Sequence, residues 1–132
     1  MPGTQRNDRA ARQRLFYALA EPTRRDIIEL LASNGQLSAT DISNNFTVSA
    51  PAISQHLKVL READCVRVEK RAQQRIYRIN PEAMSEIEGW VQEMTKQWNA
   101  RFNVLDKILE AEKKKTEERR RRKEITPQDA PV

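Results

Sequence analysis

The sequence predicts a mostly α-helical protein with one small β-hairpin and a long C-terminal helix, and three patterns support this class. Apolar residues recur at helical spacing through most of residues 11–62. The period falls to two over residues 66–79, where apolar and charged side chains alternate as they do in strands. From residue 81 a helical pattern returns, with a spacing close to a heptad repeat, and continues to about residue 111.

The first two predicted helices are separated by a proline. Residues 11–20 carry apolar side chains at helical spacing. Pro22 can occupy the first turn of a second helix, because the N–H that proline lacks has no partner at that position. This second helix is expected to continue to about Ser33. Asn34-Gly35 is a plausible end, since glycine readily adopts the left-handed conformation that closes many helices.

Two further helices with a tight connection follow. Ser38, with Asp41 three residues later, is a variant of the capping box and is expected to begin a short third helix. After a connection at residues 47–48, Ser49 can cap a fourth helix over residues 50–62. The inner face of this fourth helix is expected to consist of Ile53, Leu57 and Leu60.

The last two predicted elements are the hairpin and a long final helix. Val66 and Val68 alternate with charged residues, and a second alternating run surrounds Tyr77, with a short polar segment between them. Asn80-Pro81 then begins the final helix. Its apolar seam is interrupted only by Arg101 and consists of Met84, Ile87, Val91, Met94, Trp98, Leu105 and Ile108, with Trp90, Phe102 and Leu109 beside it.

The charge of the chain is basic overall and unevenly distributed. The chain carries 24 Lys and Arg against 19 Asp and Glu, a formal net charge of +5. Residues 50–78 hold seven basic and three acidic residues, residues 79–111 hold three and six, and residues 112–132 hold eight and five. A basic excess favours a polyanionic partner such as nucleic acid. We expect that partner at the middle segment.

The composition argues against several classes of protein. The single cysteine, Cys65, excludes an intrachain disulfide, and with only one histidine the chain does not supply a dedicated zinc or haem site, so no cofactor or metal is expected. No Gly-rich phosphate loop or nucleophile–base arrangement indicates an enzyme. The sequence has neither an apolar run of membrane-spanning length nor a signal-peptide core, which predicts a cytoplasmic protein without a membrane partner.

Two helices joined by a tight turn and followed by a basic hairpin describe a winged helix-turn-helix, which is a DNA-binding architecture. In this fold the helix 50–62 reads the major groove of double-stranded DNA, and the hairpin 66–79 contacts the flanking DNA. Gln55 can pair with adenine, and Ser54 suits either bases or phosphates. The residues expected to contact DNA are Ser49, Ala50, Pro51, Ser54, Gln55, His56, Lys58, Arg61, Lys70, Arg71, Gln73, Arg75 and Arg78.

Three stretches of the sequence resemble the ArsR-type winged-helix repressors, namely ALAEPTRRDIIELL (18–31), LSATDISNNFTVSAPAISQHLKVLREA (37–63) and VRVEKRAQQRIYRINPE (66–82). The resemblance covers about residues 18–98 and implies transcriptional repression that a signal relieves. It also implies a homodimer built from the first and last helices, with two recognition helices entering successive major grooves. The residues expected at this dimer interface are Leu15, Phe16, Leu19, Met84, Ile87, Trp90, Val91, Met94, Trp98, Phe102 and Leu105.

The sequence departs from the pattern of this family at specific positions. Ser38 and Thr40 stand where metal-sensing members have a Cys-x-Cys-type pair, and the final helix has no histidine for a second metal site. The inducer is therefore expected not to be a metal at the usual family sites. Asp64 and Ala72 stand where the family usually has glycine. Because alanine disfavours a left-handed conformation, Ala72 predicts a different turn in the hairpin.

Several residues allow a structural interpretation beside the functional one. His56 is equally consistent with a phosphate contact and with a structural hydrogen bond. For Cys65 we favour a packed, inert thiol over a redox switch. The Met and Trp residues of the final helix are interpreted as dimer core rather than as a ligand pocket, and its glutamates as a solvated face rather than a divalent-metal site.

These patterns divide the chain into three parts. Residues 1–10 are expected to be disordered, residues 11–111 to form a winged-helix domain for DNA binding and dimerisation, and residues 112–132 to form a charged extension that is disordered in part. The predicted function is a sequence-specific, homodimeric repressor whose inducer is an unidentified small molecule or redox signal. The alternative is a protein-interaction adaptor that uses the long C-terminal helix to bind a partner.

Overall fold

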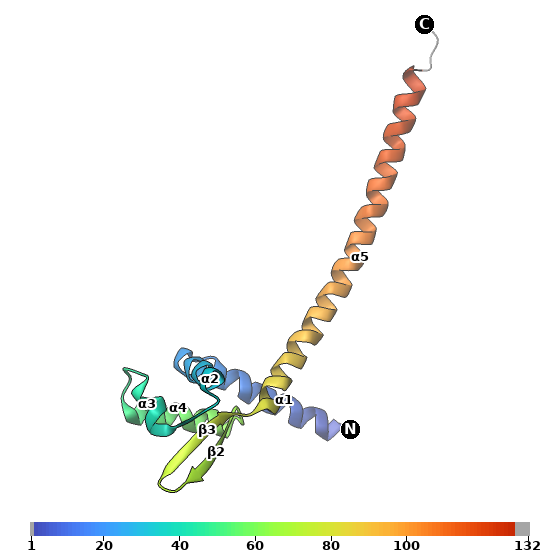
Figure 1. Ribbon diagram of the computed structural model, residues 1–132. Coiled ribbons are helices and arrows are strands. Elements are labelled where there is room, and N and C mark those ends of the chain that lie inside the picture. Colours follow the sequence, from blue (N-terminus) through green and yellow to red (C-terminus); the bar gives the residue numbers. More distant parts are fainter. Residues whose placement is uncertain (1, 129–132) are drawn as a thin grey trace. The chain divides into compact units, whose positions relative to one another are not determined.

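The computed structural model describes the backbone of residues 2–128 and the side chains of residues 9–123. The chain divides into two compact units, one ending at Gly89 and one beginning at Trp90. The predicted class, mostly helical with a small sheet and a long last helix, is confirmed. The elements in chain order (Figure 1) are α1 (Pro2–Leu19), α2 (Pro22–Asn34), β1 (Gln36–Ser38), α3 (Ala39–Asn44), α4 (Ala50–Glu62), β2 (Val66–Arg71), β3 (Gln74–Ile79) and α5 (Pro81–Gln128).

The helix ends follow the capping signals of the sequence. The side-chain oxygens of Ser38 and Ser49 accept the backbone N–H of Asp41 and Ala52, at 3.1 and 3.3 Å, and so cap α3 and α4. Gly35 ends α2 with a positive φ of 84°. These local hydrogen bonds satisfy backbone groups that have no partner within the helix. They fix where α4 begins, at the end that is expected to meet DNA.

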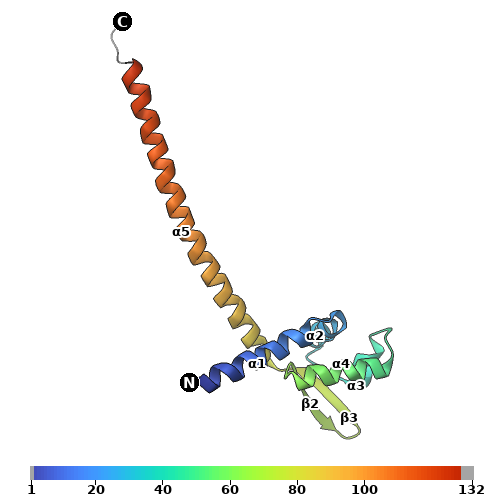
Figure 2. The same ribbon diagram turned by 180° about the vertical axis from the view of Figure 1, so that it is seen from behind.

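The hairpin of β2 and β3 (Figure 2) belongs to a three-stranded antiparallel sheet, in which β3 lies between β1 and β2. The sequence predicts only the hairpin, because β1 has three residues and is too short to show a strand period. The register pairs Val68 with Tyr77 and Lys70 with Arg75. Directly paired residues share one face of a sheet. The face that holds these four residues, here called the inner face, packs on the helices through Val68 and Tyr77.

The hydrophobic core of the first unit forms where α4 packs against the other helices and the sheet. Ile53, Leu57 and Leu60 are each no more than 2% exposed. Burial of a side chain of this size stabilises the fold by about 1.5–3 kcal/mol. The other buried apolar residues of the cluster are Leu15, Ala18, Ile27, Leu31, Ile42, Ala63, Cys65, Val66, Tyr77 and Ala83.

Asn80 connects the sheet to α5. Its side-chain oxygen accepts the backbone N–H of Glu82 at 3.2 Å, and its amide nitrogen donates to the carbonyl of Asp64 at 2.9 Å. Its own backbone N–H donates to the carbonyl of Cys65 at 2.9 Å. One side chain therefore begins α5 and holds the end of β3 against the start of β2.

Two helices extend beyond their predicted bounds. α1 begins at Pro2 rather than near residue 11, and α5 ends at Gln128 rather than near residue 111. Helix thus covers much of the segments 1–10 and 112–132, for which the sequence predicts disorder in whole or in part. Residue 1 and residues 129–132 lie outside the described residues, and the division into three parts stays a prediction.

The thiol of Cys65 is 0% exposed. Burial raises the pKa of this thiol to about 11, and the charge of Asp64 adds to the effect. At neutral pH the thiol is therefore protonated, which is its unreactive form. These properties favour the packed, inert thiol over the redox switch.

The hairpin turn is strained at an alanine. Ala72 has a φ of 53° and Asp64 a φ of 58°, so both residues adopt left-handed backbone. The expectation that Ala72 would avoid this conformation is wrong. The register leaves two residues between the paired Arg71 and Gln74, and such short hairpin loops need a positive φ at their first residue to match the strand twist.

Replacing Ala72 with glycine should stabilise the protein, because glycine adopts positive φ without a steric penalty. We expect the free energy of unfolding to rise by about 0.5–1 kcal/mol, as measured by urea denaturation followed by circular dichroism. The matched control is Ala52→Gly in α4, which should lower it by a similar amount. If both variants were destabilised equally, the left-handed turn would be incorrect.

Candidate nucleic-acid interface

The helix α4 has one buried face and one free face. Its buried face holds it in the core, so the opposite side chains point away from the protein. Short and hydrogen-bonding side chains lie near its N-terminus, and cations lie toward its C-terminus. The exposed residues of this free face are Ala50, Pro51, Ser54, Gln55, Lys58 and Arg61.

A groove of about 240 Å³ joins the free face of α4 to the hairpin. Three cations, Lys58, Arg61 and Arg75, surround it, and none of them makes an ion pair with any residue that the structure describes. Unpaired cations around a concave surface create a positive potential that attracts phosphate. The complete lining consists of Ala39, Ser54, Leu57, Lys58, Arg61, Arg75 and Tyr77.

The four cations among the predicted DNA contacts of the hairpin divide between two faces of the sheet, and the fifth predicted contact, Gln73, lies in the turn between the strands. Lys70 and Arg75 lie on the inner face, with Tyr77, and therefore on the side of α4. Arg71 and Arg78 lie on the opposite, outer face, because residues one or three positions apart in a strand alternate sides. The sequence-based prediction treats these residues as one set of DNA contacts. The odd number of positions between residues 75 and 78 already indicates that their side chains lie on opposite faces.

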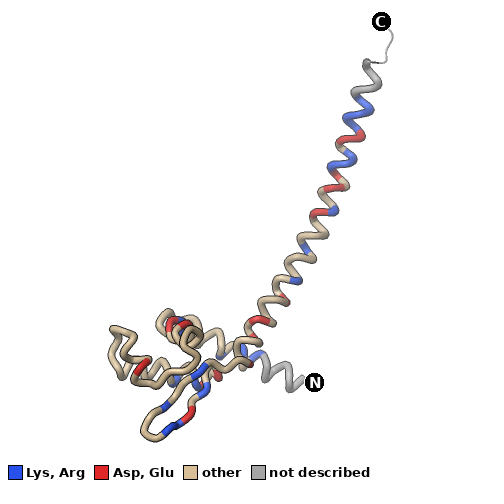
Figure 3. Tube along the Cα trace, in the orientation of Figure 1, with Lys and Arg blue, Asp and Glu red and all other residues tan. Residues whose placement is uncertain are grey.

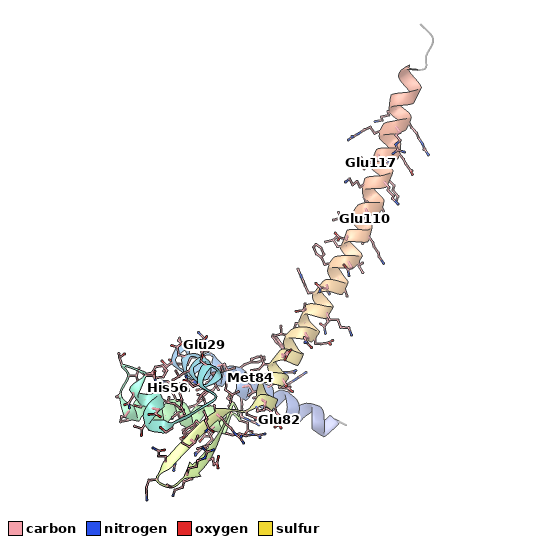
Figure 4. The ribbon with its side chains drawn as sticks, viewed as in Figure 1. Glu29, His56, Glu82, Met84, Glu110 and Glu117 are labelled. Atoms are coloured by element: carbon pink, nitrogen blue, oxygen red, sulfur yellow. The ribbon has the colours of Figure 1, made fainter. Side chains whose placement is uncertain are left out.

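Two cations on the outer face, Arg67 and Arg71, have acidic or amide neighbours. Arg71 donates to the side chain of Glu69 at 3.1 Å and to that of Gln36 at 3.5 Å. Arg67, which pairs with Arg78 across the strands, donates to Glu82 at 2.7 Å. Figure 4 shows Glu82 near the start of α5. These pairs reduce the positive charge that the outer face offers to DNA.

His56 points from α4 toward α2 rather than outward. Its side chain is 20% exposed, its Nδ1 lies 3.3 Å from the Nη1 of Arg24, and it lies 3.8 Å from the Oε2 of Glu21 (Figure 4). These contacts support the structural alternative for His56 over the phosphate contact.

Arg24 has a structural role that the sequence patterns do not indicate. Its guanidinium donates to the carbonyls of Ala18 and Tyr17, and stacks over the ring of Tyr17 with 5.6 Å to the centroid. Together with His56 it links the end of α1, the start of α2 and the middle of α4. The only sequence signal is its place in EPTRR, directly after the start of α2.

Glu21 completes this cluster as the cap of α2. Its carboxylate accepts the backbone N–H of Arg24 at 2.9 Å. Desolvation acts to raise the pKa of Glu21, but the Arg24 N–H and the nearby His56 outweigh it, so the pKa lies below its ordinary value. The carboxylate therefore stays ionised at neutral pH and keeps its capping role.

The residues predicted for a dimer interface also separate into two groups. Leu15 is 4% exposed within the core of the first unit, and Leu19, Met84 and Ile87 pack partly against that core. The remaining predicted residues are at least 37% exposed, and they are Phe16, Trp90, Val91, Met94, Trp98, Phe102 and Leu105.

Neither a metal cluster nor a membrane span is present in the described part of the chain. No group of three or more His, Cys, Asp or Glu side chains among the described residues is placed to hold a metal ion. No described helix combines the length and the apolar character that crossing a membrane requires.

Comparison with known proteins identifies the family. Residues 21–68, from the cap of α2 into β2, match the model of the bacterial regulatory proteins of the arsR family. The chain is also 34% identical over 77 residues to the transcriptional repressor SdpR of Bacillus subtilis, in an alignment covering 58% of this chain and 84% of that protein. The chain belongs to the ArsR family.

Another relative and a solved structure agree with this assignment. An HTH-type transcriptional regulator of Mycobacterium tuberculosis is 39% identical over 74 residues, covering 56% of this chain and 68% of that protein. The crystal structure of an ArsR family transcriptional regulator matches with a TM-score of 0.63 at 27% identity, covering 68% of this chain and 92% of that one. As an ArsR-family member, the chain is a DNA-binding transcriptional regulator and not an enzyme.

The two faces of the sheet make a testable difference between Arg75 and Arg78. Arg75→Ala should weaken binding to all duplexes and reduce the slope of log affinity against log salt by about 1, because one phosphate contact is lost. Arg78→Ala should change both quantities much less. Fluorescence anisotropy at several salt concentrations measures both. Equal losses in the two variants would mean that DNA also contacts the outer face.

Proposed function

We propose that the chain is a homodimeric, sequence-specific repressor that reads the major groove with α4 and contacts the flanking DNA with the hairpin. What supports this most directly is the groove that joins Ser54, Lys58 and Arg61 of α4 to Arg75 of β3. Around the groove, the hydrogen-bonding side chain of Ser54 and the three unpaired cations lie on the same side of the protein. To bind one duplex, the side chains that read bases and the side chains that contact the DNA phosphates must face the same side of the protein.

The chemistry of α4 suits base readout at its N-terminal half. The amide of Gln55 offers one donor and one acceptor, which match the N7 and N6 groups of adenine in the major groove. Ser54 can contact a base or a phosphate. The free N–H groups at the helix N-terminus add a positive dipole end that favours phosphate. Lys58, Arg61 and Arg75 then supply contacts to the backbone that do not depend on sequence.

The second copy in the proposed dimer would cover the apolar seam of α5. From Val91 to Ile108 this seam is exposed, and Val91, Met94, Trp98 and Leu105 are each 39–67% exposed. A contiguous apolar stripe of this kind is unfavourable in water and marks an interaction surface. A two-fold dimer would place two recognition helices about 10 base pairs apart, or a multiple of that.

The proposed repressor responds to a signal other than a metal at the usual family positions. The hydroxyl of Ser38, at one of those positions, is buried and caps α3, and Thr40 offers only a hydroxyl. Hydroxyl groups are poor ligands for the thiophilic metals that a Cys pair binds. The buried, protonated Cys65 is also a poor redox sensor, which leaves a small molecule as the favoured inducer.

The exposed seam of α5 also supports a different function, that of an adaptor whose partner helix would occupy the seam. Selection from a random duplex library separates the two functions. A repressor enriches a sequence from the library, whereas an adaptor enriches none.

Replacing Gln55 with alanine tests the proposed direction of readout. We expect a loss of about 1–3 kcal/mol in binding to the selected duplex, together with relaxed discrimination at one base pair. Gln13→Ala, an exposed position on α1, is the matched control and should change neither quantity. If Gln55→Ala left affinity and preference unchanged, the assignment of α4 as the recognition helix would be wrong.

Replacing Leu105 with asparagine tests the proposed dimer. Because each copy would lose a buried leucine, we expect the dimer dissociation constant to rise at least about 100-fold. Equilibrium ultracentrifugation measures it, and Asn99→Ala, outside the seam, should leave it unchanged. A wild-type protein that is monomeric at micromolar concentration would contradict the proposed dimer.

A further inference from the structure

The most basic run of side chains in the described part of the chain lies on α5, away from the groove residues in sequence. Residues 113–123 contain eight Lys and Arg and only two acidic residues, Glu117 and Glu118. All eleven side chains are exposed. Figure 3 shows these cations near the C-terminal end of α5, and Figure 4 places Glu117 among them. The eight basic residues are Lys113, Lys114, Lys115, Arg119, Arg120, Arg121, Arg122 and Lys123.

The apolar seam of α5 does not continue into this segment. The heptad spacing that gives Val91, Met94, Trp98, Leu105 and Ile108 continues to positions 112, 115, 119 and 122. Those positions hold one glutamate and three cations. In a parallel pair of helices the three cations would face identical cations, which is destabilising. The seam that would pair two copies therefore ends close to residue 109.

Charge within the segment is only partly neutralised by its own neighbours. Lys115 lies 3.9 Å from the carboxylate of Glu112, and exposed ion pairs of this kind contribute little. At 1.5 Å per residue the segment is about 16 Å long. Over that length it carries six more positive than negative charges, from eight basic and two acidic residues. Duplex DNA carries about one negative charge per 1.7 Å of axis, so the two charge densities are similar in scale.

We propose that residues 113–123 are a second DNA-binding segment, which contacts the phosphate backbone without regard to sequence. The segment has no apolar side chain to insert into a lipid bilayer. It has no glutamine, asparagine or serine to read a base edge, and the hydroxyl of its Thr116 donates to the carbonyl of Glu112 at 2.9 Å. Its eight cations offer phosphate contacts that do not depend on the base sequence. The choice of DNA as the polyanion rests on the proposed function, whereas the attraction to phosphate rests on the segment itself.

In this proposal two surfaces of the protein have different roles in DNA binding. The groove at α4 selects the sequence, and the segment 113–123 raises affinity for any nearby duplex. Because both surfaces belong to one chain, binding by one raises the effective concentration of DNA at the other. The segment should therefore strengthen binding to the selected duplex and to random duplexes by similar factors.

The test uses the full chain with four substitutions, Arg119→Gln, Arg120→Gln, Arg121→Gln and Arg122→Gln, which preserve helix propensity. Binding to a random 30-base-pair duplex is measured by fluorescence anisotropy over a series of KCl concentrations. We expect the slope of log affinity against log salt to fall by about 2–4 and the affinity at low salt to fall about tenfold or more. The ratio of affinities for selected and random duplexes should stay unchanged.

A matched control changes charge in the opposite direction. Glu117→Gln with Glu118→Gln makes the same segment more basic, so binding to the random duplex should become tighter and the salt slope steeper. Unchanged slopes in both variants would overturn the proposal. It would equally be overturned if the four arginine substitutions altered only the dimer dissociation constant, or only binding to vesicles containing an anionic phospholipid.

The experiment distinguishes a failure of this proposal from a failure of the proposed repressor function. If the protein preferred no duplex over another, the proposed sequence-specific repression would be wrong. The salt slopes of the charge variants would still show whether residues 113–123 contact DNA phosphates. If the preference persisted while the slopes did not respond, only the second binding segment would be wrong.

Discussion

Burial of one face of α4 is the constraint on which the rest of the structure depends. Ile53, Leu57 and Leu60 each recur one helical turn apart and fill the core. Because these three side chains cannot leave the core without a large loss of hydrophobic free energy, the rotation of α4 about its axis is fixed. That rotation alone turns Ser54 and Gln55 outward. The surface that we propose for DNA binding is thus a geometric consequence of packing.

Polar contacts add to the apolar packing that holds α4 in place. The cluster of Arg24, Glu21 and His56 connects α4 to the junction of α1 and α2 by polar contacts. Charge then distinguishes the surfaces. Cations around the groove are unpaired among the described residues, whereas Arg67 and Arg71 on the outer face have acidic partners. The pairing of cations, more than their number, indicates which side of the hairpin is available to phosphate.

Much of this could be predicted from the sequence, because local signals were strong. Helical spacing and the serine caps located α4 closely, and the change of period located the hairpin. β1 was too short to show a period, and the contacts of His56 depend on Arg24, which is 32 positions away in sequence. The left-handed Ala72 was mispredicted because strand register overrode the preference of the residue. The hairpin cations lie on opposite faces of the sheet because side chains alternate along a strand. Grouping these residues only by their positive charge misses that difference.

The proposed role of α4 is tested most directly by mapping which surface of the protein contacts DNA. Backbone amide chemical shifts would be recorded by NMR while a duplex enriched from a random library is titrated into the isotopically labelled protein. We expect large shift changes at Ser54, Gln55 and Arg75, which lie around one continuous surface, and small changes at Arg67 and Arg78 on the outer face. Large changes on the outer face with an unperturbed α4 would contradict the proposed role of α4.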